Sequence, residues 1–211
     1  MKSSLKLAPW VAAALALPLM SSAESNVQTG TATAAPGATA HVDFSIVIPK
    51  ILYLRVGTGS AYTTGVLTAN TTVDLVTFSP TSAQVGNGTA IAGTGGDLNG
   101  GIETAAVVSN SGNVTLNATA TGALSDGAGD SIPFTQITTA ASTLTSATAL
   151  PAPVLTNATS TNVVLTAPAS KVIVQDAKWT YSYANTANVP AGTYGGVNAN
   201  NSRVVYTATM P

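Results

Sequence analysis

No cysteine occurs in this sequence of 211 residues, and charged side chains make up 7% of it, against roughly 25% in typical soluble domains. Without cysteine the chain can form neither a disulfide nor a thiolate metal site. Because His41 is the single histidine of the sequence, a site built from several histidines is also excluded. Stability must therefore come from apolar burial and backbone pairing.

The N-terminus has the pattern of a secretory signal peptide. Lys2 and Lys6 are followed by an apolar run over residues 7–20 and by small residues at positions 21–23. The run of about 14 residues is shorter than the roughly 20 that a membrane-spanning helix needs. We therefore expect residues 1–23 to be removed after Ala23, with an uncleaved anchor as the alternative, and no transmembrane segment in the remaining chain.

Basic residues are too few to bind a polyanion. After cleavage the chain keeps five Lys and Arg residues against eight acidic ones, a net charge of about −3. No basic stripe remains to neutralise phosphates, so nucleic acid is excluded as a partner. A weakly charged surface favours association, which suits an extracellular assembly subunit better than a free periplasmic enzyme.

Helix-forming residues are scarce and strand-forming residues abundant. Glutamate occurs only at Glu24 and Glu103, whereas the chain holds 33 threonines, whose branched Cβ fits a pleated sheet, and 19 glycines, which separate strands. Apolar residues alternate with polar ones in several segments. We expect strands at residues 42–48, 51–56, 73–78, 103–109, 113–121, 162–166, 172–175, 178–184 and 203–210.

This pattern predicts an all-β fold: a single Ig-like antiparallel β-sandwich with long loops rich in Gly, Thr and Asn. We assign residues 41–211 to the sandwich and residues 24–40 to a flexible N-terminal tail, and we expect a long loop at residues 84–101. Trp179, Tyr181 and Tyr183 alternate along one segment and are expected to form the main core layer.

Residues able to support catalysis or metal binding are few. His41 and Asp43 share one strand face, but no serine lies in a G-x-S-x-G elbow, so we expect no enzyme, no catalytic residues and no cofactor. Asp126 and Asp130 lie in a Gly-rich loop that could approach calcium, but the loop lacks further acidic ligands. A solvated hairpin turn is the expected alternative, Asp97 is a weaker candidate, and no metal site is predicted.

Three segments carry a resemblance to a known family. The alternating residues 42–48, the turn at residues 190–194 and the closing segment 203–209 resemble fimbrial subunits of chaperone-usher systems and the related spore coat protein U domain. The resemblance covers about a third of the mature chain. It implies an Ig-like sandwich that lacks one strand, which the N-terminal extension of a neighbouring subunit supplies, with a periplasmic chaperone as a further partner. Members of the family carry a disulfide, which this chain cannot form.

A donated strand needs apolar residues that alternate along an extended segment. In the tail, Val27 is followed on the same side by Thr29, Thr31 and Thr33, which bury little apolar area. Residues 42–48 would donate better, but we expect them to form the integral first strand of the domain.

We expect an exported structural subunit of a fimbria, coat or extracellular matrix at the bacterial cell surface or outside the cell, reached through the periplasm. Its partners would be further copies of itself or other surface subunits. The alternative is a monomeric surface adhesin or carbohydrate-binding module. That alternative would use an exposed aromatic platform, for which the candidates are Trp179, Tyr181, Tyr183, Tyr194 and Tyr206.

Overall fold

The structure is a computed structural model that describes residues 25–33, 37–58 and 67–211. The predicted signal peptide lies outside the described residues. The chain divides into two units, Met1–Ile48 and Pro49–Pro211. All the strands of the described chain belong to the second unit, and the described part of the first unit has no regular secondary structure.

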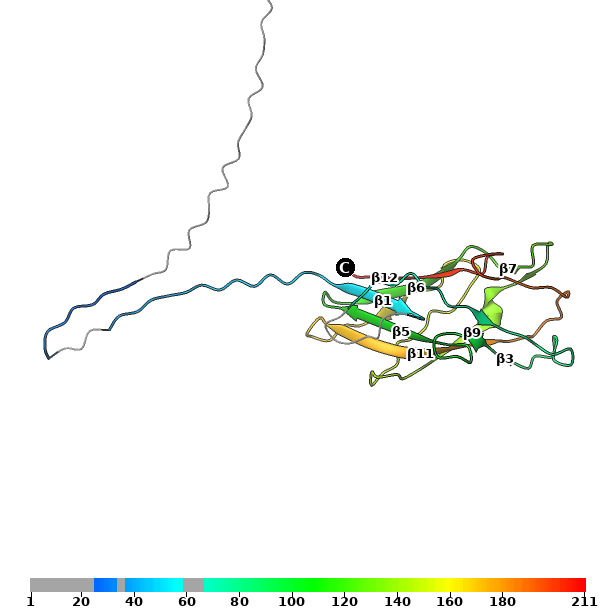
Figure 1. The fold of residues 1–211 in the computed structure, drawn as a ribbon, viewed down its shortest axis with the longest axis horizontal. Helices are drawn as coiled ribbons and strands as arrows, with labels where there is room; N and C mark the ends of the chain where they lie inside the picture. Colours follow the sequence, from blue (N-terminus) through cyan, green and yellow to red (C-terminus); the bar gives the residue numbers. More distant parts are fainter. Residues whose placement is uncertain (1–24, 34–36, 59–66) are drawn as a thin grey trace, which may run out of the picture. The chain divides into compact units, whose positions relative to one another are not determined.

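Two antiparallel sheets dominate the second unit (Figure 1). The larger sheet has the order β1-β5-β11, and both β3 and β9 pair with β11. Its strands are β1 (Leu52–Val56), β3 (Ile91–Ala92), β5 (Ile102–Ser109), β9 (Ile137–Ser142) and β11 (Ile173–Tyr183). The smaller sheet has the order β10-β6-β12, formed by β6 (Val114–Ala120), β10 (Val163–Leu165) and β12 (Val204–Thr209).

Short elements complete the described part of this unit. β2 (Val76–Thr77) pairs with β4 (Thr94–Gly95), and β7 (Leu124–Ser125) pairs with β8 (Ser131–Ile132). A single 3-10 turn, η1 (Phe134–Gln136), leads into β9. The predicted long loop at residues 84–101 thus contains two short strands, β3 and β4.

The core lies between the two sheets and follows the alternation of the sequence. In β6 the apolar residues Val114 and Leu116 are fully buried, while the intervening Thr115 and Asn117 are partly exposed. Trp179 of β11 is fully buried, its indole Nε1 donates to the carbonyl oxygen of Leu150 at 2.8 Å, and its ring lies 5.3 Å from that of Tyr206. The predicted all-β antiparallel sandwich is confirmed, as is the core role of the β11 aromatics.

The prediction of an integral first strand at residues 42–48 is wrong. These residues form no strand, and all of them are exposed. The compact unit begins at Pro49 rather than at residue 41. The physical reason is that alternating apolar residues specify a strand only if a neighbouring strand is available to pair with them, and within the described chain this segment pairs with none.

Smaller corrections concern strand boundaries. Residues 172–175 and 178–184 were expected to form two strands, but they belong to one long strand, β11. Of the strand expected at 73–78, only Val76–Thr77 is formed. β9 was not predicted, because its sequence, ITTAAS, contains one large apolar residue and gives little periodicity.

Candidate functional site

Within the part of the chain that the structure describes, the sandwich has one side on which each sheet ends in an unpaired edge. Among the described residues, β1 pairs only with β5 and β12 pairs only with β6. The two edge strands pack against each other across the sheets. We call the open edges of β1 and β12 together the seam. Unpaired backbone N–H and C=O groups along such an edge can pair with an added strand.

Apolar side chains line the seam and are only partly covered. β1 contributes Leu52, Leu54 and Val56, and β12 contributes alternate residues from Val204 onward, all packed against the main core. The central strands differ, since Val107 of β5 is fully buried. The core is therefore only partly covered at the seam, and one more apolar strand there would cover it further. The lining residues are Leu52, Leu54, Val56, Val204, Tyr206, Ala208 and Met210.

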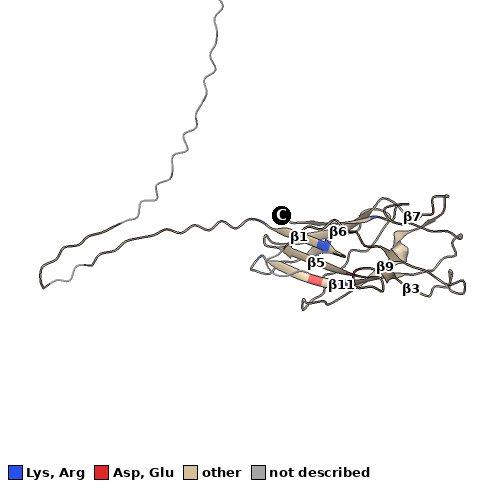
Figure 2. Ribbon diagram, viewed as in Figure 1, with Lys and Arg blue, Asp and Glu red and all other residues tan. Residues whose placement is uncertain are grey.

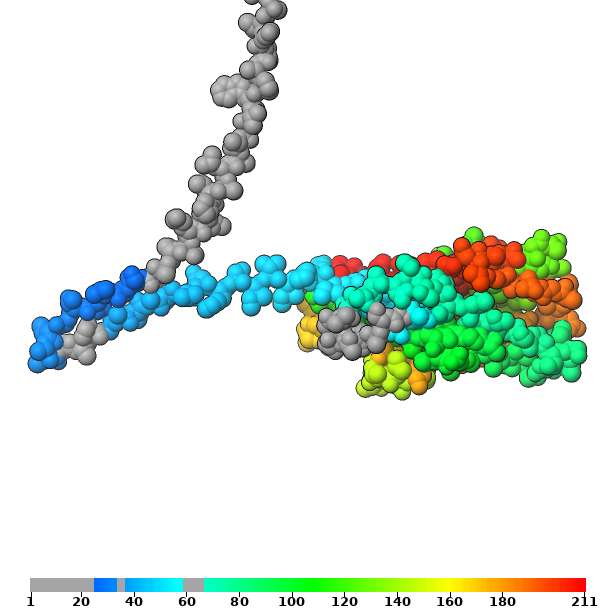
Figure 3. All heavy atoms as spheres, in the orientation of Figure 1, coloured from blue at the N-terminus to red at the C-terminus, as the bar shows by residue number. Residues whose placement is uncertain are grey.

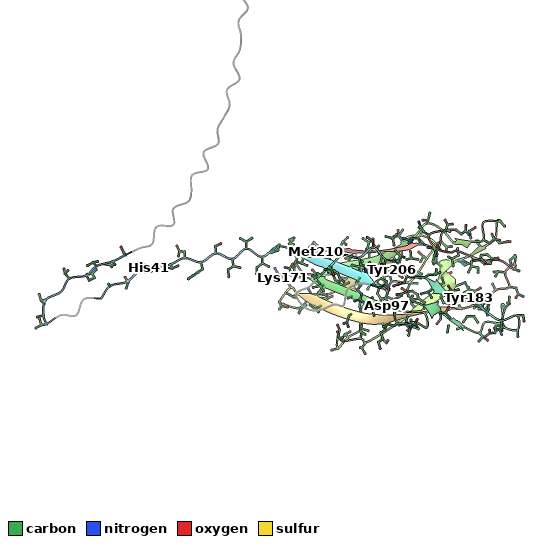
Figure 4. The ribbon with its side chains drawn as sticks, in the orientation of Figure 1. His41, Asp97, Lys171, Tyr183, Tyr206 and Met210 are labelled. Carbon is green, nitrogen blue, oxygen red and sulfur yellow. The ribbon has the colours of Figure 1, made fainter. Side chains whose placement is uncertain are left out.

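A pair of tyrosines lies in the middle of the seam, and Figure 4 labels one of them, Tyr206. The hydroxyls of Tyr181 on β11 and Tyr206 on β12 lie 2.8 Å apart and share a hydrogen bond that ties the two sheets together. Burial raises the pKa of Tyr206 to about 12. Burial also raises the pKa of Tyr181, well above its ordinary value. Both hydroxyls are therefore neutral hydrogen-bonding groups, and neither is suited to act as a base near neutral pH.

The first unit carries an apolar segment of matching character. Phe44, Ile46 and Ile48 alternate along the segment and are 90%, 85% and 75% exposed, while Val47 on the opposite side is 90% exposed. Figure 3 draws this part of the chain, in light blue, as an extended stretch of atoms. Exposed apolar residues in such a row usually mark an interaction site. Fully burying each large apolar side chain would be worth about 1.5–3 kcal/mol.

Apart from the seam, a groove of about 880 Å³ lies between β10 and the first half of β11. Val164, Val172 and Val174 line it. At its β11 edge the backbone of Asp176 is already paired, because Leu150 N–H donates to the carbonyl of Asp176 at 3.0 Å and Asp176 N–H donates to Ser146 Oγ at 2.9 Å. The seam is thus the better acceptor of an added strand.

The residues that the sequence suggested for chemistry do not form a functional site within the described part of the chain. His41 and Asp43 lie in the exposed first unit, with no strand to hold them on a common face. In the second unit, Trp179, Tyr181 and Tyr183 are buried with at most 7% exposure, so they offer no platform on which a sugar ring could stack.

The loop of Asp126 is a tight turn between β7 and β8. One carboxylate oxygen of Asp126 accepts the backbone N–H groups of Ala128, Gly129 and Asp130 at 2.8, 3.1 and 3.0 Å. These hydrogen bonds, that from Ala128 first, lower the pKa of Asp126. The residues thus form a hairpin turn in which Asp126 Oδ1 is occupied by backbone amides. Among the described residues, no three His, Asp or Glu side chains come together as metal ligands.

Charge is sparse on both sheets, as Figure 2 shows with a few blue and red segments on largely tan strands. In the part of the chain that the structure describes, no helix is long and apolar enough to span a membrane. Fold and seam together define the class: an all-β sandwich in which the edges of β1 and β12 are unpaired among the described residues. Comparison with family models, curated proteins and solved structures found no match to this chain.

Proposed function

We propose that this protein is an exported, non-enzymatic structural subunit of a cell-surface fimbria, coat or extracellular matrix. Its copies would assemble by placing residues 42–48 of one chain into the seam of the next. The observation that carries the proposal is that the same chain has both an exposed, alternating apolar segment and an open, apolar seam.

Length and shape support this assignment. A strand of seven residues spans about 20 Å at roughly 3.3 Å per residue. This is enough to cover β12, which has six residues. Phe44, Ile46 and Ile48 would face the core, and the segment backbone would pair with the open edge of β12. This mode of recognition takes affinity from main-chain hydrogen bonds and specificity from alternate side chains.

Charge supports the same proposal. Among the lining residues of the seam none is charged, and residues 42–48 carry a single carboxylate, that of Asp43. Assembly would therefore depend on apolar burial and backbone pairing, and it should be only weakly sensitive to salt.

The test is the mass of the exported chain by size exclusion with light scattering, for the wild type, Ile46→Asp and Val47→Asp. The two substituted residues are adjacent, β-branched and similarly exposed, but they face opposite sides of the segment. Ile46→Asp should abolish polymers because it places a charge in the apolar seam. Val47→Asp should leave them largely intact.

Deleting residues 24–40 should also leave polymers intact, because the donor segment begins after the tail. Equal behaviour of the two aspartate variants would contradict strand donation. A wild-type chain that is monomeric at all concentrations would overturn the assembly proposal and favour the monomeric surface adhesin instead.

A further inference from the structure

One acidic side chain lies on the core-facing side of β5. Glu103 is 5% exposed and stands in the same row as Ala105 and Val107, which are fully buried. A carboxyl group at such a position is costly unless its charge is neutralised or well paired. The chain contains only eight acidic residues, so this placement needs a physical explanation.

The backbone closes around this carboxyl group. Its Oε2 accepts the backbone N–H of Asp97 at 3.2 Å. Gly57, at φ +82°, packs so closely that a Cβ there would lie 2.9 Å from Oε2, and Gly96, also at φ +82°, would place one 3.1 Å from Oε1. Only glycine combines these conformations with so close an approach.

A second carboxyl group, that of Asp74, meets the first. The carboxyl oxygens of Asp74 and Glu103 lie against the same glycine, since a Cβ at Gly57 would meet Asp74 Oδ2 and would lie 2.9 Å from Glu103 Oε2. Asp74 also accepts the hydroxyl of Thr58 at 2.6 Å and the Thr58 N–H, which fixes the chain just after β1. Two carboxylates held this close, one of them buried, repel each other unless one of them carries a proton.

The other charged groups nearby do not neutralise Glu103. Arg55 of β1 donates to Asp97 at 3.3 Å, and its charge also helps to lower the pKa of Asp74, which keeps Asp74 rather than Glu103 ionised. Tyr181 of β11 and Tyr206 of β12 face Glu103 from the core side and are themselves neutral. Burial first, and then the charges of Asp74 and Asp97, raise the pKa of Glu103 to about 8. Figure 4 labels Asp97 and Tyr206 in this unit.

We propose that Glu103 and Asp74 form a proton-dependent lock. One proton shared by their carboxyl groups ties the start of β5 to the segment before β2 and, through Thr58, to the end of β1. Loss of the proton leaves two carboxylates in contact beside Asp97, and their repulsion loosens this end of the sandwich. The lock is internal to one chain and does not depend on the proposed assembly.

The proton is tested directly by infrared spectroscopy of the exported full chain. At pH 6–7 ordinary carboxyl groups are ionised. The wild type should nevertheless show the carbonyl band of one protonated carboxylic acid, which disappears on titration through about pH 8. Glu103→Gln should lack this band, whether the chain is monomeric or assembled. Absence of the band in the wild type would overturn the lock.

Equilibrium unfolding gives a second readout. Because the folded chain holds a proton that the unfolded chain releases near pH 4.5, the unfolding constant of the wild type should rise with pH up to about 8, at most about tenfold per pH unit. Glu103→Gln can still donate to Asp74 and accept from Asp97, so it should lose this dependence. Asp130→Asn, which removes an exposed carboxyl outside both the donor segment and the seam, is the control and should keep it.

Should Glu103→Gln fail to fold, Asp74→Asn provides the decisive comparison. Removing the neighbouring negative charge should move the disappearance of the infrared band to lower pH. An unchanged midpoint in Asp74→Asn, or the same pH dependence in Glu103→Gln and the wild type, would contradict a shared proton.

Discussion

Glu103 and Asp176 are both buried, yet their carboxyl groups respond to pH in opposite directions. Asp176 accepts the N–H groups of Thr145 and Ser146 at 2.9 and 2.8 Å and the hydroxyl of Thr145. Burial alone would raise the pKa of Asp176, but these hydrogen bonds, that of the Thr145 hydroxyl first, lower it below its ordinary value of 3.8. Its contribution to stability is present above pH 3.8 and is lost as the pH falls through the folded pKa.

For Glu103 the contribution to stability changes with pH in the opposite direction. Its folded pKa of about 8 lies above its ordinary value of 4.5. The stabilising proton is therefore fully favourable below pH 4.5, and its contribution declines as the pH rises to about 8. Together the two residues predict the greatest stability between about pH 3.8 and pH 4.5, where both contributions are present.

The substitution Asp176→Asn tests the role of this carboxylate. It should lower the free energy of unfolding by about 1.5–3 kcal/mol at pH 7, because hydrogen bonds to a charged acceptor are lost and the new amide group faces donors. Urea unfolding at several pH values measures the effect. The difference from the wild type should shrink below pH 3.8, where the wild-type carboxyl also becomes protonated. A difference that stays constant into strong acid would contradict this role.

At the scale of elements, alternation predicted the strands that pair within the chain. β5, β6 and β12 were each expected within a few residues of their bounds, and β11 was expected as two segments, because apolar residues alternate along these strands. The buried aromatic row of β11 was predicted for the same reason. Period-two patterns report the two faces of a strand directly.

The same reasoning failed where the partner of a strand or a side chain was not encoded locally. Residues 42–48 alternate as clearly as β6, but alternation does not specify which chain supplies the neighbouring strand. Glu103 was assigned to a strand without its partners, since Asp74 and Asp97 come from separate loops. The sequence signal for this site is that Glu103 shares its strand face with the apolar residues Ala105 and Val107.

Hydrogen exchange at β12 tests the seam at the scale of one strand. In a monomer, such as Ile46→Asp, the amides on the open edge of β12 should exchange rapidly, because β6 pairs with only one side of the strand. In assembled wild-type chains these amides should become protected. The amides of β6 serve as the internal control and should be protected in both, since β6 pairs on both sides. Unchanged exchange at β12 on assembly would place the contact elsewhere.

On the scale of the whole molecule, each chain would offer one donor segment and one seam. Such a head-to-tail contact uses two different surfaces, so it forms rings where its rotation closes and open filaments where it does not. The absence of cysteine means that no covalent bond between cysteines could hold such a filament together. Its strength would come from the buried apolar row and from the completed β12 edge.

A chain with a defective donor but an intact seam should act as a terminator. Adding Ile46→Asp to the wild type before assembly should shorten polymers in proportion to its share, because this variant can accept a segment but cannot supply one. Electron microscopy and light scattering measure the length, and Val47→Asp, expected to donate normally, is the matched control. If both variants shorten polymers equally, or neither does, the two surfaces do not act as donor and acceptor. Selective shortening by Ile46→Asp would instead assign the donor to the apolar face that contains Phe44, Ile46 and Ile48.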